Sequence, residues 1–219
     1  MGVLLMLMTI GGLIAAGVLL AVSFFMKIVW LRKFTLGGIA VWLAFYFVML
    51  LGFSLFSTEK TLAIGEAKEY CGFYLDCHMH TTVTGVRTAQ TLGDRTANGK
   101  FYIVKVKVFS DAKRARLGLL TVDTHVVDGE NREYSRDTRA EEKLPPQPAF
   151  EKQVGPEESF EKEVVFDLPA DVKDPRLDIA EGFGIDKVIE SVLVDDEDSI
   201  LHKRNYFKLQ EQNMTTGVN

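Results

Sequence analysis

The sequence predicts a two-helix membrane anchor followed by an all-β sandwich domain. Three features lead to this fold class: two long apolar runs near the N-terminus, a short basic segment between them, and alternating apolar and polar residues with regular turn signals through most of the remainder. We expect the anchor to occupy residues 1–58, a juxtamembrane segment residues 59–70, the sandwich residues 71–210 and a flexible tail residues 211–219.

Two N-terminal runs, Met1–Met26 and Phe34–Thr58, contain no Asp, Glu, Lys or Arg. A helix crosses a hydrocarbon core about 30 Å thick with roughly 20 apolar residues, and both runs exceed that length. We therefore expect membrane-spanning helices over about residues 3–26 and 35–57. A cleaved signal peptide is the alternative for the first run, but signal peptides begin with a basic region that Met1–Met8 lacks.

The charges between the two runs predict the orientation of the anchor. Lys27, Arg32 and Lys33 are the only charged residues among the first 58, and all three are basic. Because cytoplasmic loops are enriched in Lys and Arg, the basic segment is expected inside, and both the N-terminus and everything after Thr58 outside. The sequence thus predicts a multi-pass protein of the plasma (inner) membrane, in contact with the lipid bilayer, whose soluble domain is periplasmic or extracellular.

The soluble part of the chain is acidic. Residues 59–219 contain 22 Lys plus Arg against 30 Asp plus Glu. A nucleic-acid-binding domain presents a basic stripe to the phosphates, and no such stripe is present here. We therefore expect no nucleic acid among the partners.

Short segments rich in β-branched and aromatic residues, separated by turn signals, predict the strands of the sandwich. Thr61–Tyr70 is expected to be weakly helical or irregular. Asp94–Lys100, with Asn98-Gly99 just before the next strand, is expected to reverse the chain, and Asp128-Gly129 to form a hairpin turn. The expected strands are His78–Val86, Phe101–Phe109, Leu119–Val127, Arg132–Ser135, Phe160–Leu168, Arg176–Ala180, Lys187–Val194 and Asn205–Leu209.

The order of three pieces carries a family resemblance. They are Gly99–Val108, a strand ending at Asp128-Gly129, and Val154–Pro169, which holds Val164-Val165-Phe166 before a closing proline. Over about 100 residues this order resembles the bacterial DUF4352, telokin-like family of immunoglobulin-like domains. The resemblance implies an immunoglobulin-like, non-enzymatic, extracytoplasmic sandwich, often tethered to a membrane. Here two helices take the place of the lipidated cysteine that is common in the family.

These observations predict a class of function rather than a ligand. We expect a binding or scaffolding module of the cell envelope, which meets other envelope proteins or an unknown small ligand. The sequence contains no GxSxG, HExxH or phosphate-binding glycine loop. We therefore expect no enzyme activity, no catalytic residues and no cofactor.

The only two cysteines, Cys71 and Cys77, allow three interpretations. In an oxidising compartment they are expected to form a disulfide, which requires the chain to loop between them. Alternatively, the segment Cys77-His78-Met79-His80 handles copper or zinc, with His78 and His80 on the same face of a strand. Thiol redox catalysis is the third interpretation, but it usually needs a CxxC motif, which is absent here.

Overall fold

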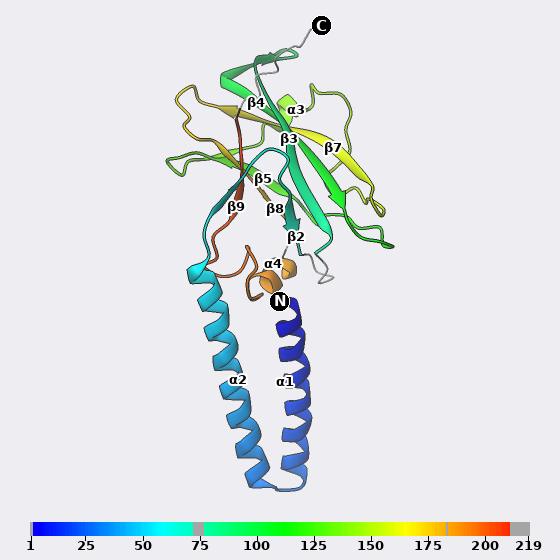
Figure 1. The fold of residues 1–219 in the computed structure, drawn as a ribbon, viewed down its shortest axis with the longest axis vertical. Helices are drawn as coiled ribbons and strands as arrows, with labels where there is room; N and C mark the ends of the chain where they lie inside the picture. Colours follow the sequence, from blue (N-terminus) through cyan, green and yellow to red (C-terminus); the bar gives the residue numbers. More distant parts are fainter. Residues whose placement is uncertain (1, 72–76, 183, 211–219) are drawn as a thin grey trace. The chain divides into compact units, whose positions relative to one another are not determined.

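The computed structural model describes residues 2–71, 77–182 and 184–210, and the predicted flexible tail lies outside this range. The described chain forms two compact units (Figure 1). One unit comprises the N-terminal chain through Thr58 together with Lys187–Arg204. The other comprises Glu59–Asp186 and the chain from Asn205 onward.

The first unit is built on two antiparallel helices, α1 (Gly2–Phe25) and α2 (Val29–Phe56). By length and composition both can cross a bilayer, and little of their apolar surface is buried within the protein. The indole of Trp42 links them by donating to Thr9 Oγ1 at 3.0 Å. Helix α2 begins earlier than expected, so Arg32 and Lys33 lie in its first turns rather than in a loop.

The second element of this unit is a segment expected to be a strand. The prediction for Lys187–Val194 is wrong: the chain forms a short helix, α4 (Ile185–Glu190), and then a series of turns. The β-branched residues of Lys187–Val194 are typical of a strand in composition. However, strand β8 (Arg176–Ala180) ends before this segment, and Gly182, which follows β8, has a φ of 99°. Residues 187–204 therefore belong with the helices and not with the sandwich, which corrects the expected domain boundary.

The other unit is a sandwich of two β-sheets, as predicted. The first sheet has the strand order β2-β3-β4-β7, with every neighbour antiparallel. Its strands are β2 (Lys68–Tyr70), β3 (Met79–Leu92), β4 (Arg95–Ser110) and β7 (Ser159–Leu168).

The second sheet has the order β1-β9-β8-β5-β6, and only β1 and β9 run parallel. Its other strands are β1 (Lys60–Leu62), β5 (Asp123–Val127), β6 (Glu133–Ser135) and β9 (Asn205–Lys208). The expected juxtamembrane segment, residues 59–70, thus supplies β1 and β2, one strand to each sheet. It is part of the sandwich and not a linker.

The main core lies between the sheets and follows the alternation read from the sequence. Val104, Val106 and Val108 of β4 are buried there, together with Phe166 of β7 and Phe207 of β9. Their burial supplies the main hydrophobic stabilisation of the domain.

The opposite face of β4 holds a second, smaller core. Phe101 and Ile103 point to this side and are also buried. They are covered by Ala140 of the short helix α3 (Thr138–Glu141) and by Leu144 after it. Both faces of the first sheet are therefore covered at this end, which explains why Ile103 is buried although it opposes the valines.

The two turns that were predicted from glycine residues differ in how well the structure agrees with them. Asp128-Gly129 connects β5 and β6 as predicted. The buried Asp128 carboxylate accepts hydrogen bonds from the backbone N–H of Arg132 at 2.9 Å and from its Nε at 2.6 Å. Burial alone would raise the pKa of Asp128, but these hydrogen bonds and those from Glu130 and Tyr134 outweigh it and lower that pKa to about 2.

Of the predicted turn Asp94–Lys100, only Asp94 lies in the turn that the structure forms, so its placement at Asn98-Gly99 is wrong. The β3–β4 hairpin turns at Gly93-Asp94, where Gly93 has a φ of 61°, and Asn98 and Gly99 lie within β4. A Cβ at Gly99 would overlap the carbonyl of Leu168 in the neighbouring strand. The glycine is needed for close approach of two strands rather than for a turn.

We predict that Gly99→Ala destabilises the sandwich by about 1–3 kcal/mol, because the added methyl pushes β4 and β7 apart. Gly129→Ala is the matched control, since a Cβ there meets the Lys173 carbonyl at 3.4 Å, an ordinary contact. Thermal unfolding of the full chain in detergent, followed by near-UV circular dichroism, gives the comparison. Equal melting temperatures for the two variants would contradict the prediction.

Candidate functional site

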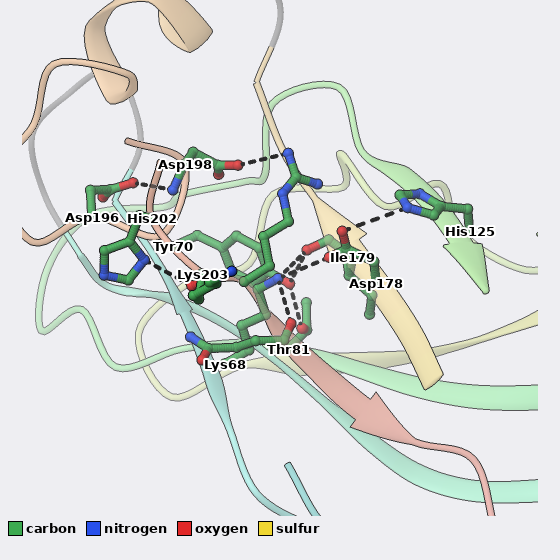
Figure 2. A network of polar contacts seen from close by, with 12 residues as sticks. Lys68, Tyr70, Thr81, His125, Asp178, Ile179, Asp196, Asp198, His202 and Lys203 are labelled. Atoms are coloured by element: carbon green, nitrogen blue, oxygen red, sulfur yellow. Dashed lines mark hydrogen bonds and ion pairs between the residues drawn. The ribbon is translucent and has the colours of Figure 1, made fainter. Parts of the chain in front are cut away.

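An ion pair is buried between the two sheets (Figure 2). Lys68 of β2 and Asp178 of β8 are each 1% exposed in their side chains, and Lys68 Nζ lies 3.3 Å from Asp178 Oδ1. The same ammonium donates to the carbonyl of Ile179 at 2.7 Å and to the carbonyl of Asn205 at 3.3 Å. One side chain of the first sheet thus holds two strands of the second.

Neighbouring polar groups extend this network. The Tyr70 hydroxyl donates to the Ile179 carbonyl at 3.2 Å and lies 2.8 Å from Thr81 Oγ1. His125 of β5 is paired in register with Asp178 and places Nε2 3.7 Å from its Oδ2 (Figure 2). The Lys68 ammonium and the Asp178 carboxylate are buried in the core and pair with each other. This arrangement stabilises the contact between the sheets and does not form a ligand-binding site.

The predicted metal-ligand segment lies at the start of β3, and only part of it converges. His78 Nδ1 lies 2.7 Å from Asp111 Oδ1, and His80 Nε2 lies 3.5 Å from the same oxygen. The hydrogen bond from His78 is the largest of the contacts that lower the pKa of Asp111. The His80 ring also stacks on Phe109, with 5.1 Å between the ring centroids.

The other two members of the segment, Met79 and Cys77, have structural roles. Met79 is 5% exposed and belongs to the main core. Cys77 is joined to Cys71 in a disulfide, with 4.1 Å between the Cα atoms, while the chain between them lies outside the described residues. Glu69 has its carboxylate near both sulfurs, but sulfurs in a disulfide are not thiolates and do not serve as metal ligands.

The sequence did not reveal Asp111 as a partner of the two histidines. It follows the end of β4, and its backbone N–H donates to the His78 carbonyl at 3.2 Å. Met79 pairs with Ser110 in the β3–β4 register, so the residues next to them also meet. This register depends on the hairpin turn at Gly93-Asp94, whereas the turn predicted from the sequence extended over Asp94–Lys100.

One hollow of about 400 Å³ lies at an end of the second sheet. Its lining includes Arg176, Lys208 and Asp174. The Arg176 guanidinium pairs with Glu59 and packs over the Tyr206 ring, 4.8 Å from its centroid. The hollow offers room for a small ligand, but its cationic groups share it with an acidic one.

The residues that predict membrane orientation lie together at the connection between the helices. Lys27 stands between α1 and α2 with a φ of 55°, and Arg32 and Lys33 follow in α2. The Arg32 guanidinium packs over the Phe24 ring, 4.9 Å from its centroid. The basic cluster is thus at the end of the hairpin opposite Gly2 and Phe56 (Figure 1).

Fold and sites together define a β-sandwich domain that follows two apolar N-terminal helices. Residues 76–189 match the family described as domain of unknown function DUF4352. The chain therefore belongs to this family, which confirms the resemblance found in the sequence.

Two solved structures are similar to part of the chain. The secreted protein MPT63 of Mycobacterium tuberculosis has 10% identity and a TM-score of 0.40, covering 59% of this chain and 93% of its own. An uncharacterized β-sandwich protein of Clostridium difficile 630 has 15% identity and a TM-score of 0.38, covering 70% of this chain and 96% of its own. No curated protein matches the chain.

We predict that Lys68→Met destabilises the sandwich by about 3–5 kcal/mol, because it leaves the Asp178 carboxylate buried without its ammonium partner. The double variant Lys68→Met/Asp178→Leu should recover most of this loss, since neither charge then remains in the core. Denaturant unfolding of the full chain in detergent measures both.

Lys105→Met is the surface control for this comparison. Lys105 pairs with Glu161 at 3.6 Å, and both side chains are about half exposed. Its removal should change the free energy of unfolding by less than about 1 kcal/mol. A loss for Lys68→Met as small as that of the control would show that the buried pair contributes no more than a surface pair.

Proposed function

We propose that this protein is a non-enzymatic binding or scaffolding module of the cell envelope, anchored in the plasma membrane by α1 and α2 and displaying its β-sandwich on the extracytoplasmic side. The observation that carries the proposal is the charge distribution of the first 58 residues. The only charges there are Lys27, between the helices, and Arg32 and Lys33, in the first turns of α2, while the rest of both helices carries none.

The disulfide supports the orientation. Disulfides persist in oxidising compartments outside the cytoplasm, and Cys71–Cys77 lies in the sandwich unit. The basic connection and the disulfide both favour an external sandwich and an internal connection between the helices. The membrane is then the first partner, and other envelope proteins or a small ligand remain the expected partners of the sandwich.

The sandwich also supports a non-enzymatic role. Two deeply buried ionisable groups, Lys68 and Asp178, are paired with each other inside the core, where a substrate does not reach them. This arrangement contributes to packing and register rather than to proton transfer. The net negative charge of the soluble part favours partners other than nucleic acids.

We predict that a protease added to spheroplasts digests the sandwich and leaves the connection between the helices intact. An epitope tag at the C-terminus should disappear, while a tag inserted after Lys27 should survive until the membrane is permeabilised. The reverse pattern would overturn the proposed orientation. Loss of both tags before permeabilisation would overturn the membrane span itself.

A second candidate function is metal handling, and the convergence of His78, His80 and Asp111 favours it. Imidazole nitrogens and a carboxylate oxygen are ligand types suited to zinc or copper, and both histidines contact Asp111 Oδ1. The three ligand atoms do not all lie within 4.8 Å of one another, so the side chains would have to move to bind one ion. The sequence offered His78 and His80 as the ligands, and the structure adds Asp111 beside them.

Titration of the purified full chain with Zn²⁺ or Cu²⁺ separates the two candidates. On the leading proposal, His78→Ala/His80→Ala and Asp111→Asn should bind each metal as the wild type does. His202→Ala is the control, because His202 belongs to the other unit. A tenfold or greater loss of affinity in the first two variants, but not in the control, would favour the metal candidate instead.

A further inference from the structure

Residues 187–204 dock onto the helical hairpin at the end opposite its basic connection. Three hydrogen bonds attach this segment to α2 and its C-terminal cap: Tyr46 Oη donates to the Val192 carbonyl at 2.6 Å, Ser54 Oγ lies 3.2 Å from Ser199 Oγ, and the Lys203 N–H donates to Ser57 Oγ at 2.8 Å. The segment is therefore tied to the last turns of α2 by specific polar contacts.

The segment also contacts the start of α1. Gly2 is buried and lies so close to Val194 that a Cβ at Gly2 would overlap the Val194 carbonyl. Because α1 and α2 are antiparallel, Gly2 and Ser54 are at the same end of the hairpin. The segment thus covers the ends of both helices at the level where a membrane-spanning helix reaches the bilayer surface.

Exposed large apolar side chains occur on both the hairpin and this segment. Among the described residues, every large hydrophobic side chain that is exposed belongs to residues 4–56 or to residues 188–201. In the segment these are Val188, Val192, Ile200 and Leu201, which are 63%, 37%, 47% and 61% exposed. The described part of the sandwich exposes none, so the exposure is confined to the part of the chain that accompanies the helices.

The backbone of the segment holds these side chains outward. Leu201 has a φ of 64°, a conformation that large side chains rarely adopt. Two backbone hydrogen bonds of 3.0 Å fix the turn, from Ile200 to the Ser191 carbonyl and from His202 to the Ser199 carbonyl. A strained backbone that presents a large apolar side chain away from the protein is explained when something apolar covers that side chain.

The charges of the segment indicate what kind of surface covers it. Lys187, Lys203 and Arg204 are outnumbered by Glu190 and the four acidic residues of 195–198. Arg204 is also engaged with Asp198 at 3.4 Å. A segment with this balance does not bind a membrane through anionic headgroups, so its affinity for lipid comes from apolar contact.

We propose that residues 187–204 form an interfacial element of the anchor, whose Val188, Ile200 and Leu201 side chains insert into the outer leaflet among the lipid headgroups and upper acyl chains. This inference rests on the proposed membrane anchor and extends it. The partner is the lipid surface, because this segment and the hairpin both expose large apolar side chains. The anchor then consists of two spans and one surface-lying segment rather than of two spans alone.

Single-cysteine labelling tests this proposal in the full chain. Leu201→Cys and Val188→Cys, each labelled with an environment-sensitive maleimide dye without reductant, are reconstituted in phosphatidylcholine vesicles. Val41→Cys, at a position 72% exposed within α2, is the control for the span, and Lys113→Cys, exposed on the sandwich, is the control for water. The wild type, whose cysteines are joined, provides the unlabelled blank.

We expect the dyes at Leu201→Cys and Val188→Cys to be quenched at least threefold more by brominated acyl chains than the dye at Lys113→Cys, and to be shielded from aqueous iodide. If Val41→Cys lies in lipid while both segment positions behave like Lys113→Cys, the interfacial proposal is overturned and the anchor stands. Protection from both quenchers would place a protein surface over the patch, which also overturns it. A water-exposed Val41→Cys would overturn the anchor itself.

Discussion

The ion pair between Lys68 and Asp178 is the constraint on which the sandwich depends. A charge removed from water needs a partner, and here one ammonium satisfies a carboxylate and two backbone carbonyls on the opposite sheet. Strand β2 is only three residues long, so its backbone pairing alone holds it weakly. The buried lysine fixes it against β8 and β9 and so sets the register between the sheets.

Local patterns in the sequence were sufficient wherever the structure is determined locally. The two helices follow from runs without charge, and the inward valines of β4 follow from alternation at Phe101–Phe109. Local patterns failed where a distant contact decided the outcome. Gly99 is needed because Leu168 lies against it, and Lys187–Val194 leaves the sheet because its contacts are with α1 and α2. Neither contact is visible within a window of ten residues.

The site residues also fall into those that local sequence patterns identify and those that only distant contacts bring together. His78, His80 and the cysteine pair could be selected from residue type and spacing, whereas Asp111 could not, because only the β3–β4 register brings it to the histidines. Lys68 was missed because its segment was expected to be weakly helical or irregular. Asp178 was missed because a charged residue in a short strand is normally assigned to the solvent face. The one local signal was Asp178 between Leu177 and Ile179, a charge flanked by apolar residues. A buried polar pair becomes recognisable only when both of its members are seen together.

The buried pair also shows that the folding unit is larger than the family match. The match covers residues 76–189, which include Asp178 but neither Lys68 nor β9. A chain limited to that range would leave the Asp178 carboxylate in the core without the ammonium and would remove β9, the partner of β8 on one side. Strands β1 and β2 directly follow the helical hairpin, and β9 begins immediately after residues 187–204. The sandwich is therefore completed by the same parts of the chain that connect it to the helices. The lysine that the core requires therefore lies in the segment that follows α2 in the chain.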